Sequence, residues 1–521
     1  MKKTWVSVLA TTALTLSVGS VYAQPAHAEQ STKQSVATAP VLESAFTSAA
    51  KEFGVPKDLL MAISYSESRW QIAPEEARTS SEPDKNNGKG LMHLQDNSFK
   101  KGLSEAAKAL GVSKKQMEDD IQLNIRGGAY LLSKAQKDLG KTLTANANDW
   151  YEAVASFEGA KDKDLGALFA DEVYRVLKEG TALAISGGTL TLDPNKSIAP
   201  AKGSYAGLIP GGTNYGLTPD YSGAIWNPAS SSNYAVASRP TSNAITSVII
   251  HDTEGSYSGS INWFKDPAAQ VSAHYIVRSS DGQITQLVQD KDIAWHARTF
   301  NTNGIGIEHE GYAAQTGWYT DAMYTASAAL TRAVCLKYNI PMDREHIMAH
   351  SELWGNDHTD PGVNWDWNKY MSKVTGVTKN YDAVLVDNTD ASSGFSLGGP
   401  SQYWHPTAGY GIHNQMTYTM GNGTNPISNY ATWRPTITTS GNYQVKVFIP
   451  SNFAATTNAK YEIHYNGGVI TKTISQAAYS NQWVSLGTYS FAAGTTGYVM
   501  LGDNTGDKAY VGIDGMRFLA Q

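Results

Sequence analysis

Hydrophobic and polar positions follow a helical period in the first third of the chain. Apolar residues recur there at spacings of three and four, as at Leu42 and Phe46. The stretches 124–132 and 167–177 repeat this spacing between charged residues. The block 41–185 is therefore predicted to be an α-helical domain.

The middle of the chain alternates between strand-like and helical patterns. Short apolar and β-branched runs occupy 247–251, 274–277 and 305–308, and a long helical pattern covers 321–338. This alternation predicts an α/β domain with a mixed central sheet over 220–378.

The last third has a strand pattern throughout. Short β-branched and aromatic runs are separated by Gly, Asn and Ser turns over 381–521, where only 13 of 141 residues are charged. The pattern predicts an all-β sandwich. Between the first two blocks, 186–219 is rich in Gly, Pro, Ser and Thr without periodicity, which predicts a linker.

The first 28 residues have the organisation of a secretory signal peptide. Lys2 and Lys3 precede an apolar tract, and small-residue cleavage patterns end at Ala23 or Ala28. The alternative is a membrane anchor, which the short, Ser/Thr-rich tract disfavours. Because no later segment has 18 consecutive apolar residues, we expect a secreted or cell-wall-associated protein without a membrane span after processing.

The amino-acid composition limits which partners and which metal ligands are possible. The 521 residues carry a net charge of −6, so there is no basic field to attract nucleic acid. The single cysteine excludes a disulfide framework and a multi-cysteine zinc site, and Cys335 fits a small buried apolar residue. Any bound metal must be held by His, Asp or Glu.

Seven of the twelve histidines lie between His251 and His358, which points to a metal site. His251 ends a buried strand pattern, His350 closes a short apolar run, and Asp360 lies in a turn-prone segment. Two histidines and one carboxylate leave a fourth position for water, as in hydrolytic zinc sites. The alternative for each histidine is a hydrogen-bonded structural role.

Seven motifs in the central block resemble the zinc-dependent N-acetylmuramoyl-L-alanine amidase family, which is related to the peptidoglycan recognition proteins. In chain order they are Ser247-Val-Ile-Ile-His251, Val271-Ser-Ala-His-Tyr275, Asp281-Gly282, Ala294-Trp-His-Ala297, Gly304-Ile-Gly-Ile-Glu308, Ala349-His-Ser351 and Thr359-Asp-Pro-Gly362. The resemblance implies peptidoglycan as substrate and hydrolysis of the amide between the lactyl group of muramic acid and L-Ala.

The resemblance also implies roles for individual residues. His251, His350 and Asp360 match the zinc ligands, Glu308 matches a glutamate beside the metal-activated water, and His358 matches a residue that stabilises the transition state. We expect Glu308 to accept the proton of the water and His358 to hydrogen-bond the oxyanion. Because all three metal ligands are present, an enzyme is favoured over a non-catalytic wall receptor or scaffold.

Four other histidines of the central block are expected to lie outside the group of metal ligands. His274 is expected to be structural or to line the groove, and His296 either lines the substrate groove or packs with Trp295. His309 alternates with its neighbours along a strand and should face away from the metal. His346 is also placed outside the site.

The N-terminal block resembles the lysozyme-like lytic transglycosylase family. The motifs are Ser64-Tyr-Ser-Glu67-Ser-Arg69, Gly90-Leu-Met-His-Leu94, Asn124-Ile-Arg-Gly-Gly-Ala-Tyr-Leu131 and Ala155-Ser-Phe-Glu-Gly159. Glu67 matches the family's catalytic acid. His93 replaces the usual Gln, and Ser156-Phe-Glu158 replaces Ala-Tyr-Asn. The alternatives are therefore glycan cleavage, a peptidoglycan-binding remnant, or a helical domain with a surface glutamate.

The C-terminal block resembles the golvesin C-terminal-like domain. Its motifs are Val386-Asp-Asn-Thr-Asp390, Ala431-Thr-Trp-Arg-Pro435, Gly441-Asn-Tyr-Gln-Val-Lys-Val-Phe448, Gln482-Trp-Val-Ser-Leu-Gly487 and Ile513-Asp-Gly-Met-Arg-Phe518. The resemblance implies a sugar- or wall-binding β-sandwich. Tyr403, Trp404 and Tyr410 are candidates for stacking on sugars, or alternatively for packing between the sheets. Three aspartates, Asp387, Asp390 and Asp514, are candidates for a structural Ca²⁺.

Overall fold

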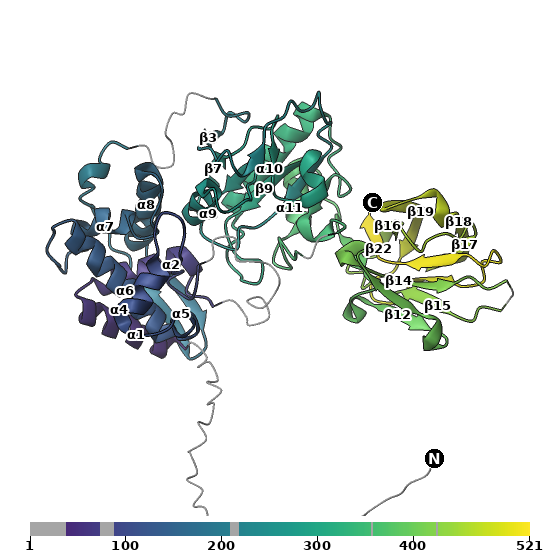
Figure 1. Ribbon diagram of the computed structural model, residues 1–521, viewed down its shortest axis with the longest axis horizontal. Helices are drawn as coiled ribbons and strands as arrows, with labels where there is room; N and C mark the ends of the chain where they lie inside the picture. Colours follow the sequence, from purple (N-terminus) through teal and green to yellow (C-terminus); the bar gives the residue numbers. More distant parts are fainter. Residues whose placement is uncertain (1–37, 73–87, 209–217, 356–357, 424–425) are drawn as a thin grey trace, which may run out of the picture. The chain divides into compact units, whose positions relative to one another are not determined.

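The computed structural model describes residues 38–72, 88–208, 218–355, 358–423 and 426–521 (Figure 1). The expected signal peptide lies outside these residues. None of the helices in the described part of the chain is long and apolar enough to cross a bilayer.

The N-terminal domain is built from helices that bury a common apolar core, as the 3.6-residue pattern predicts. The core includes Phe46, Met61 and Leu132, each fully buried. The helices are α1 (Ala39–Phe53), α2 (Lys57–Ser68), α4 (Gly102–Leu110), α5 (Lys114–Asp119), α6 (Ile121–Asp138), α7 (Tyr151–Ala155) and α8 (Lys163–Glu179).

The expected linker over 186–219 is wrong in its first part. Strands β1 (Thr181–Ile185) and β2 (Gly188–Leu192) form an antiparallel hairpin, and the side chains of Leu190 and Leu192 are buried in the helical core. Ile198 packs there as well. The alternation in Thr189-Leu-Thr-Leu192 is a short half-buried strand, and the abundance of Gly, Ser and Thr around it obscured that pattern.

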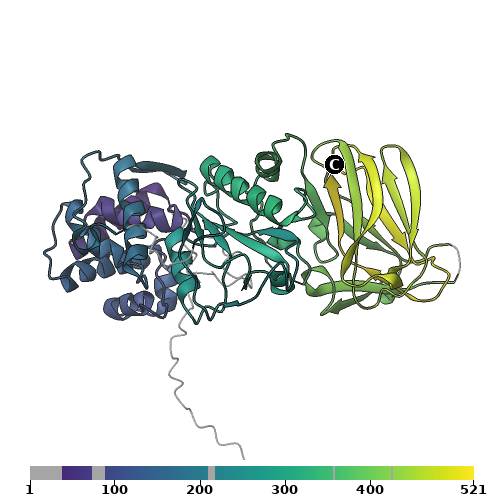
Figure 2. The same ribbon diagram turned by 90° about the horizontal axis from the view of Figure 1, so that it is seen from above.

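The central domain has a six-stranded mixed sheet in the order β10-β5-β9-β6-β7-β3, in which β6 and β7 pair antiparallel and the other neighbours pair in parallel. Helices α10 (Asp321–Tyr338) and α11 (Trp367–Thr375) cover one face, and α9 (Tyr257–Lys265) packs with apolar residues of the other face (Figure 2). The strands are β3 (Ala224–Trp226), β5 (Ser247–Ile250), β6 (Tyr275–Val277), β7 (Ile284–Gln286), β9 (Gly304–His309) and β10 (Ile347–Ala349), and β4 (Tyr234–Ala235) pairs with β8 (Ile293–Ala294).

Residues alternate between the two faces of this sheet. Val248 and Ile250 of β5, and Ile305 and Ile307 of β9, contribute to the core beneath α10 and α11. Ile249 lies in a separate small cluster, on the opposite face. The residue that follows Ile250 therefore belongs to the face away from α10, where the candidate site is found.

The C-terminal domain is all β, as predicted. Its sheets have the strand orders β11-β22-β16-β19, β12-β15-β20-β17-β18 and β13-β14-β21, and they enclose a core around Trp433 and Tyr461. The strands are β11 (Ala383–Val386), β12 (Phe395–Gly398), β13 (His405–Ala408), β14 (Gln415–Met420), β15 (Tyr430–Trp433), β16 (Gly441–Ile449), β17 (Ala459–Tyr465), β18 (Gly468–Ile474), β19 (Gln482–Phe491), β20 (Tyr498–Gly502), β21 (Tyr510–Ile513) and β22 (Met516–Ala520).

Candidate metal centre

Two histidines follow neighbouring parallel strands of the central sheet. Strands β5 and β10 pair in register with Ile250 opposite Ala349, so His251 and His350 are the next residues on each strand. Parallel strands bring their carboxyl ends to the same edge of a sheet. The two imidazoles meet there, with Nδ1 of His251 3.1 Å from Nδ1 of His350.

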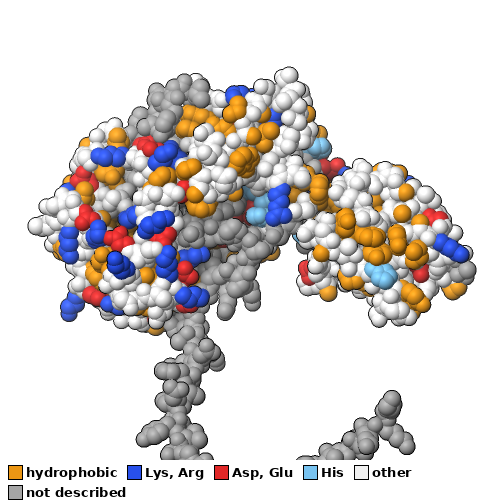
Figure 3. Space-filling view, viewed as in Figure 1, with side chains coloured by type: hydrophobic (Ala, Val, Ile, Leu, Met, Phe, Trp, Pro, Cys, Tyr) orange, Lys and Arg blue, Asp and Glu red, His pale blue; other side chains and the backbone are white. Residues whose placement is uncertain are grey.

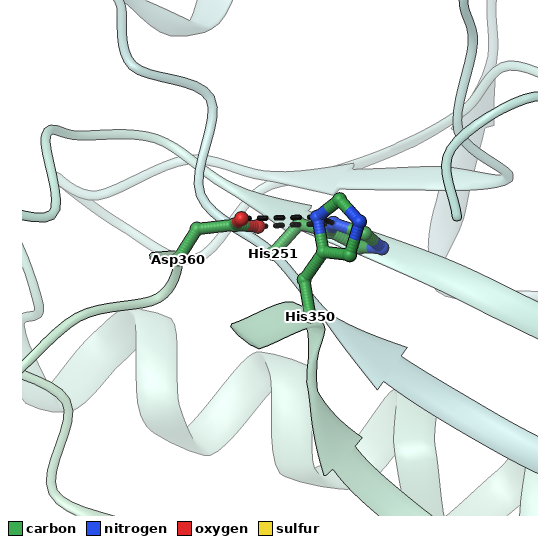
Figure 4. Close-up of side chains that lie close together, drawn as sticks. All are labelled: His251, His350 and Asp360. Carbon is green, nitrogen blue, oxygen red and sulfur yellow. Dashed lines mark hydrogen bonds and ion pairs between the residues drawn. The ribbon is translucent and has the colours of Figure 1, made fainter. Parts of the chain in front are cut away.

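Asp360 completes this group from the loop after β10. Its Oδ2 lies 3.0 Å from Nδ1 of His251, and its Oδ1 lies 3.0 Å from Nδ1 of His350 (Figure 4). The Asp360 carbonyl accepts a hydrogen bond from the Ser351 amide, which ties the loop to the segment after His350.

The donor set fits a metal ion. All three side chains are buried, and each offers one ligand atom within 4.8 Å of the others. Among the described residues, this is the one group of three or more His, Cys, Asp or Glu side chains with such spacing. Two imidazole nitrogens and one carboxylate oxygen are a ligand set of catalytic zinc, and a cation relieves the cost of burying a carboxylate.

Glu308 lies on the same face of the sheet as the metal-site candidates. Ile307 of β9 pairs with Ile250 of β5 and points into the core beneath α10, so Glu308 faces the other side. The Glu308 side chain is buried, with an exposed fraction of 2%. The strand register thus brings the expected proton acceptor to the sheet edge that carries His251.

His358 contacts the candidate ligands directly. Its ring stacks on the ring of His350, with centroids 4.2 Å apart and an interplanar angle of 25°. Its Nδ1 lies 3.7 Å from Oδ1 of Asp360, and its side chain keeps an exposed fraction of 20%. This exposure leaves the imidazole reachable for a substrate, which the role expected from the sequence requires.

Neither of the two histidines placed outside the site belongs to the group of His251, His350 and Asp360, although Nδ1 of His309 lies 2.8 Å from the backbone carbonyl oxygen of His251. His309 faces the α10 side, where its Nε2 lies 2.6 Å from the Ser327 hydroxyl and its ring packs on Trp365. Burial lowers the pKa of His309 to about 4, so its imidazole is neutral. His346 pairs with Asp343 at a partly exposed position.

His296 contacts the Nε2 edge of the His251 ring, and His274 lies beside His296, with ring centroids 5.5 Å apart. Nδ1 of His274 accepts a hydrogen bond from the Gly306 amide at 3.0 Å, a structural role. Nδ1 of His296 lies 3.0 Å from Nε2 of His251, so His296 contacts a candidate ligand from the side opposite Asp360. The sequence left His296 between groove lining and packing, because only the tertiary structure brings its loop to β5.

The N-terminal domain brings Glu67 together with the two residues that depart from the transglycosylase pattern. Glu67 lies in the last turn of α2 with an exposed fraction of 1%, and its Oε2 lies 3.3 Å from Nδ1 of His93. The carboxyl of Glu158 accepts hydrogen bonds from the hydroxyls of Ser256 and Ser258. Burial raises the pKa of Glu158 well above its ordinary value, and the adjacent Glu67 carboxylate raises it further. The two carboxyl groups and the His93 imidazole thus form one buried group at the end of α2.

The aromatic side chains singled out in the C-terminal domain differ in exposure. Tyr403 is 52% exposed. Trp404 is partly buried against the sandwich core, and its indole donates to the Gly398 carbonyl. Tyr410 packs edge-to-face on Phe453. Stacking on sugars thus remains open for Tyr403, whereas Trp404 has the packing role.

Three segments match known protein families. Residues 241–363 match N-acetylmuramoyl-L-alanine amidase, residues 44–165 match the transglycosylase SLT domain, and residues 384–520 match the golvesin C-terminal domain. The amidase match lies in the domain with the candidate metal centre, the transglycosylase match in the helical domain, and the golvesin match in the β-sandwich.

Individual relatives match parts of the chain. N-acetylmuramoyl-L-alanine amidase A of Achromobacter lyticus is 45% identical over 174 residues, which are 30% of this chain and 96% of that protein. The 1,6-anhydro-N-acetylmuramyl-L-alanine amidase AmpD of Haemophilus influenzae is 35% identical over 113 residues, 20% of this chain and 59% of that protein. Xanthan lyase of a Bacillus species is 26% identical over 140 residues, 26% of this chain and 15% of that protein. The chain thus spans less than two thirds of the length of the latter two.

Proposed function

Because the chain belongs to the N-acetylmuramoyl-L-alanine amidase family, we propose that its buried His251, His350 and Asp360 hold the zinc ion of a peptidoglycan amidase. The bond hydrolysed is the amide between the lactyl group of N-acetylmuramic acid and L-Ala of the stem peptide. The observation that carries the proposal is the convergence of two Nδ1 atoms and one carboxylate at 3.0–3.1 Å from one another.

The chain's own residues supply the proton transfers. A zinc ion in this site would act as a Lewis acid that polarises the amide carbonyl and acidifies a water molecule. Glu308 accepts a proton from the attacking water and delivers it to the nitrogen of L-Ala, while the new C–O bond forms and the C–N bond breaks. His358 donates a hydrogen bond to the oxygen on which negative charge develops.

Two measurements test the amidase proposal together. Metal analysis of the purified full chain should find one zinc per molecule, and incubation with isolated cell walls should release stem peptides with free L-Ala amino termini. The competing function is a wall receptor or scaffold, which would bind walls and release no peptide. Zinc-free protein that binds walls and releases nothing would establish that alternative.

For the N-terminal domain we propose a glycan-directed role centred on Glu67. Its match to the transglycosylase SLT domain and the buried carboxyl at the end of α2 support this role. The Asp360→Asn full chain, in which the amidase is silenced, should convert walls to anhydro-muramyl products if Glu67 acts as a general acid. Products that persist in a Glu67→Gln, Asp360→Asn double variant would exclude Glu67 as the acid. Wall binding without products would assign the domain a binding function.

The C-terminal domain offers an aromatic surface for a glycan. The rings of Tyr418 and Phe453 stack at 4.3 Å, and Tyr510, 39% exposed, packs edge-to-face on both. Phe453 adopts a left-handed backbone conformation with φ 53°, which is costly for a bulky residue and indicates that the ring position is enforced. Figure 3 shows apolar side chains gathered on this domain among few charges. Aromatic faces of this kind bind the C–H faces of sugars.

Removing this surface should weaken binding to walls. Tyr510→Ala and Phe453→Ala should reduce cosedimentation of the full chain with peptidoglycan glycan, whereas Tyr479→Ala, at a side chain that is 37% exposed, serves as an exposed aromatic control. Equal cosedimentation of all four proteins would contradict a glycan-binding role for the Tyr418–Phe453–Tyr510 cluster.

We also propose a structural Ca²⁺ in the C-terminal domain. Asp387 Oδ2, Asn388 Oδ1 and Asp514 Oδ2 are buried oxygens that accept no hydrogen bond from the described residues. Burial raises the pKa of Asp514 well above its ordinary value, and the Asp387 charge raises it further, an arrangement that an oxygen-liganded cation relieves. Asp390 is excluded from the proposed Ca²⁺ ligands, because it is exposed and its Oδ1 accepts a hydrogen bond from the Ser392 amide.

Thermal melting tests the calcium proposal. Addition of Ca²⁺ to chelator-treated protein should raise the melting temperature of the C-terminal domain, and Asp514→Asn should abolish the increase. An unchanged melting curve over millimolar Ca²⁺ would rule out the site.

Export is the remaining element of the proposed function. The positive, apolar and small-residue segments of the first 28 residues support it. Amino-terminal sequencing of the protein from a culture supernatant should begin after Ala23 or Ala28. A membrane-bound product that still begins at Met1 would show an anchor instead.

A further inference from the structure

We propose that His296 is a positioning residue for the metal centre, because its Nδ1 accepts the hydrogen bond from the Nε2–H of His251. This bond fixes the tautomer and the ring orientation in which His251 turns Nδ1 toward His350 and Asp360. The inference rests on the proposed zinc site and deepens it, since it names the residue that prepares one ligand for the metal.

The two nitrogens of His251 have opposite surroundings. Nδ1 faces His350 Nδ1 and Asp360 Oδ2 at 3.1 and 3.0 Å, and Nε2 faces His296 Nδ1 at 3.0 Å. A neutral imidazole carries one proton, so a nitrogen that binds a metal leaves the proton on the other nitrogen. The Nε2–H of His251 is buried and requires an acceptor, and His296 Nδ1 is within hydrogen-bond distance.

The loop around His296 is fixed by its backbone. The amides of His296 and Ala297 both donate to Oδ1 of Asn301, at 2.9 and 2.6 Å. This shared acceptor sets the direction in which the His296 side chain leaves the loop. The ring therefore approaches His251 at a defined angle, with their planes 88° apart.

Strand β9 provides the space for the ring. A Cβ atom on Gly306 would lie 2.6 Å from Cγ and Nδ1 of His296, closer than real Cβ contacts. The Gly306 amide meanwhile donates to His274 Nδ1, which holds the strand in place. Glycine weakens a strand interior, and it is typically found there where another group approaches the backbone closely. The glycine at 306 is thus explained by the imidazole that sits on it.

The positioning role of His296 differs in its requirements from the two roles that the sequence left open, groove lining and packing with Trp295. Lining the groove requires contact with substrate, and packing with Trp295 requires only apolar volume. A positioning role requires an acceptor at the place of Nδ1. Asparagine can place its Oδ1 near that position, whereas leucine supplies volume without an acceptor, so the two substitutions separate the roles.

The experiment measures zinc affinity in the full chain by competition with a chromophoric chelator. His296→Leu should weaken zinc binding by about 10–100-fold, the usual effect of removing a partner of a metal-bound histidine. His296→Asn should recover most of the affinity. Gly306→Ala should weaken binding in the same direction as His296→Leu, because the added methyl displaces the ring. His346→Leu, at a partly exposed position away from the ligands, is the matched control.

A second readout does not depend on zinc. Imidazole ¹⁵N shifts of the metal-free wild-type chain should report a hydrogen bond at Nε2 of His251, and His296→Leu should remove this bond and change how the proton is shared between the two nitrogens. Unchanged zinc affinity and an unchanged tautomer in His296→Leu would overturn the proposal. If the wild type binds no zinc but the tautomer still responds to His296, the zinc proposal fails while the hydrogen bond stands. Equal losses in the Leu and Asn variants would assign His296 a packing or groove role.

Discussion

Nδ1 of His251 and Nδ1 of His350 lie 3.1 Å apart, although 99 positions separate the two residues in the chain. The cause is the parallel register of β5 and β10, in which Ile250 faces Ala349. Each histidine is the first residue beyond its paired strand, so the backbone hydrogen bonds of the sheet set the separation of the two rings. The candidate metal centre therefore depends on strand pairing as much as on the identity of its residues.

Removal of a ligand should abolish metal binding. His251→Ala and Asp360→Asn should each lose stoichiometric zinc and all measurable amidase activity, because two protein ligands do not make a catalytic zinc site. Metal analysis after gel filtration checks the loss. Full zinc content in either variant would contradict the assignment of that residue, and retained circular dichroism would show that the fold is intact.

Glu308 and His358 should be needed for turnover and not for metal retention. Glu308→Gln and His358→Ala are expected to keep zinc and to lower kcat by about 10²–10³-fold, the typical cost of losing a catalytic proton acceptor or an oxyanion donor. Release of stem peptides at saturating substrate measures kcat. Near-normal turnover in both variants would remove these residues from the mechanism, whatever the zinc content.

Glu158 should make stability depend on pH. Because its pKa is raised in the folded state, its contribution to stability is present below the ordinary pKa of 4.5 and is lost as pH rises through the raised value. Glu158→Gln mimics the protonated carboxyl at all pH values and should raise the melting temperature more at pH 8 than at pH 4. An increase of equal size at both pH values would argue against a raised pKa.

Cys335 should be chemically inert in the folded protein. Its side chain is 1% exposed in α10, and burial raises its pKa to about 12, so the thiol is protonated at pH 8. A disulfide-exchange reagent should label about one thiol per molecule in denaturant and almost none without it. Rapid labelling of the native protein would mean that α10 opens readily.

The β1–β2 hairpin should stabilise the N-terminal domain. Leu190 is 1% exposed, and Leu190→Ala should lower the free energy of unfolding by about 2–5 kcal/mol, as for other buried leucines. Val236→Ala, at a side chain that is 79% exposed, should change it by less than about 0.5 kcal/mol. A loss as small as that of the control would restore the interpretation of this segment as a linker.

Local patterns were sufficient for most of the elements. The helical pattern at 321–338 is α10, and the run at 247–251 contains β5, because the period of apolar positions reports which face an element buries. The hairpin of β2 was missed because Thr and Gly are also frequent in turns. Its two buried leucines are too short a pattern to stand out from the residues around them.

The sequence by itself determined the three fold types, the residue types of the candidate metal ligands and the alternation that turns Glu308 and His309 to opposite faces of one strand. These properties depend on neighbours within a few residues. The tertiary structure decided which of these side chains contact each other. It placed Nδ1 of His296 beside Nε2 of His251. It also gathered Glu67, His93 and Glu158 in one buried group. Such contacts join residues tens of positions apart through strand register and helix packing, and no local pattern encodes that geometry.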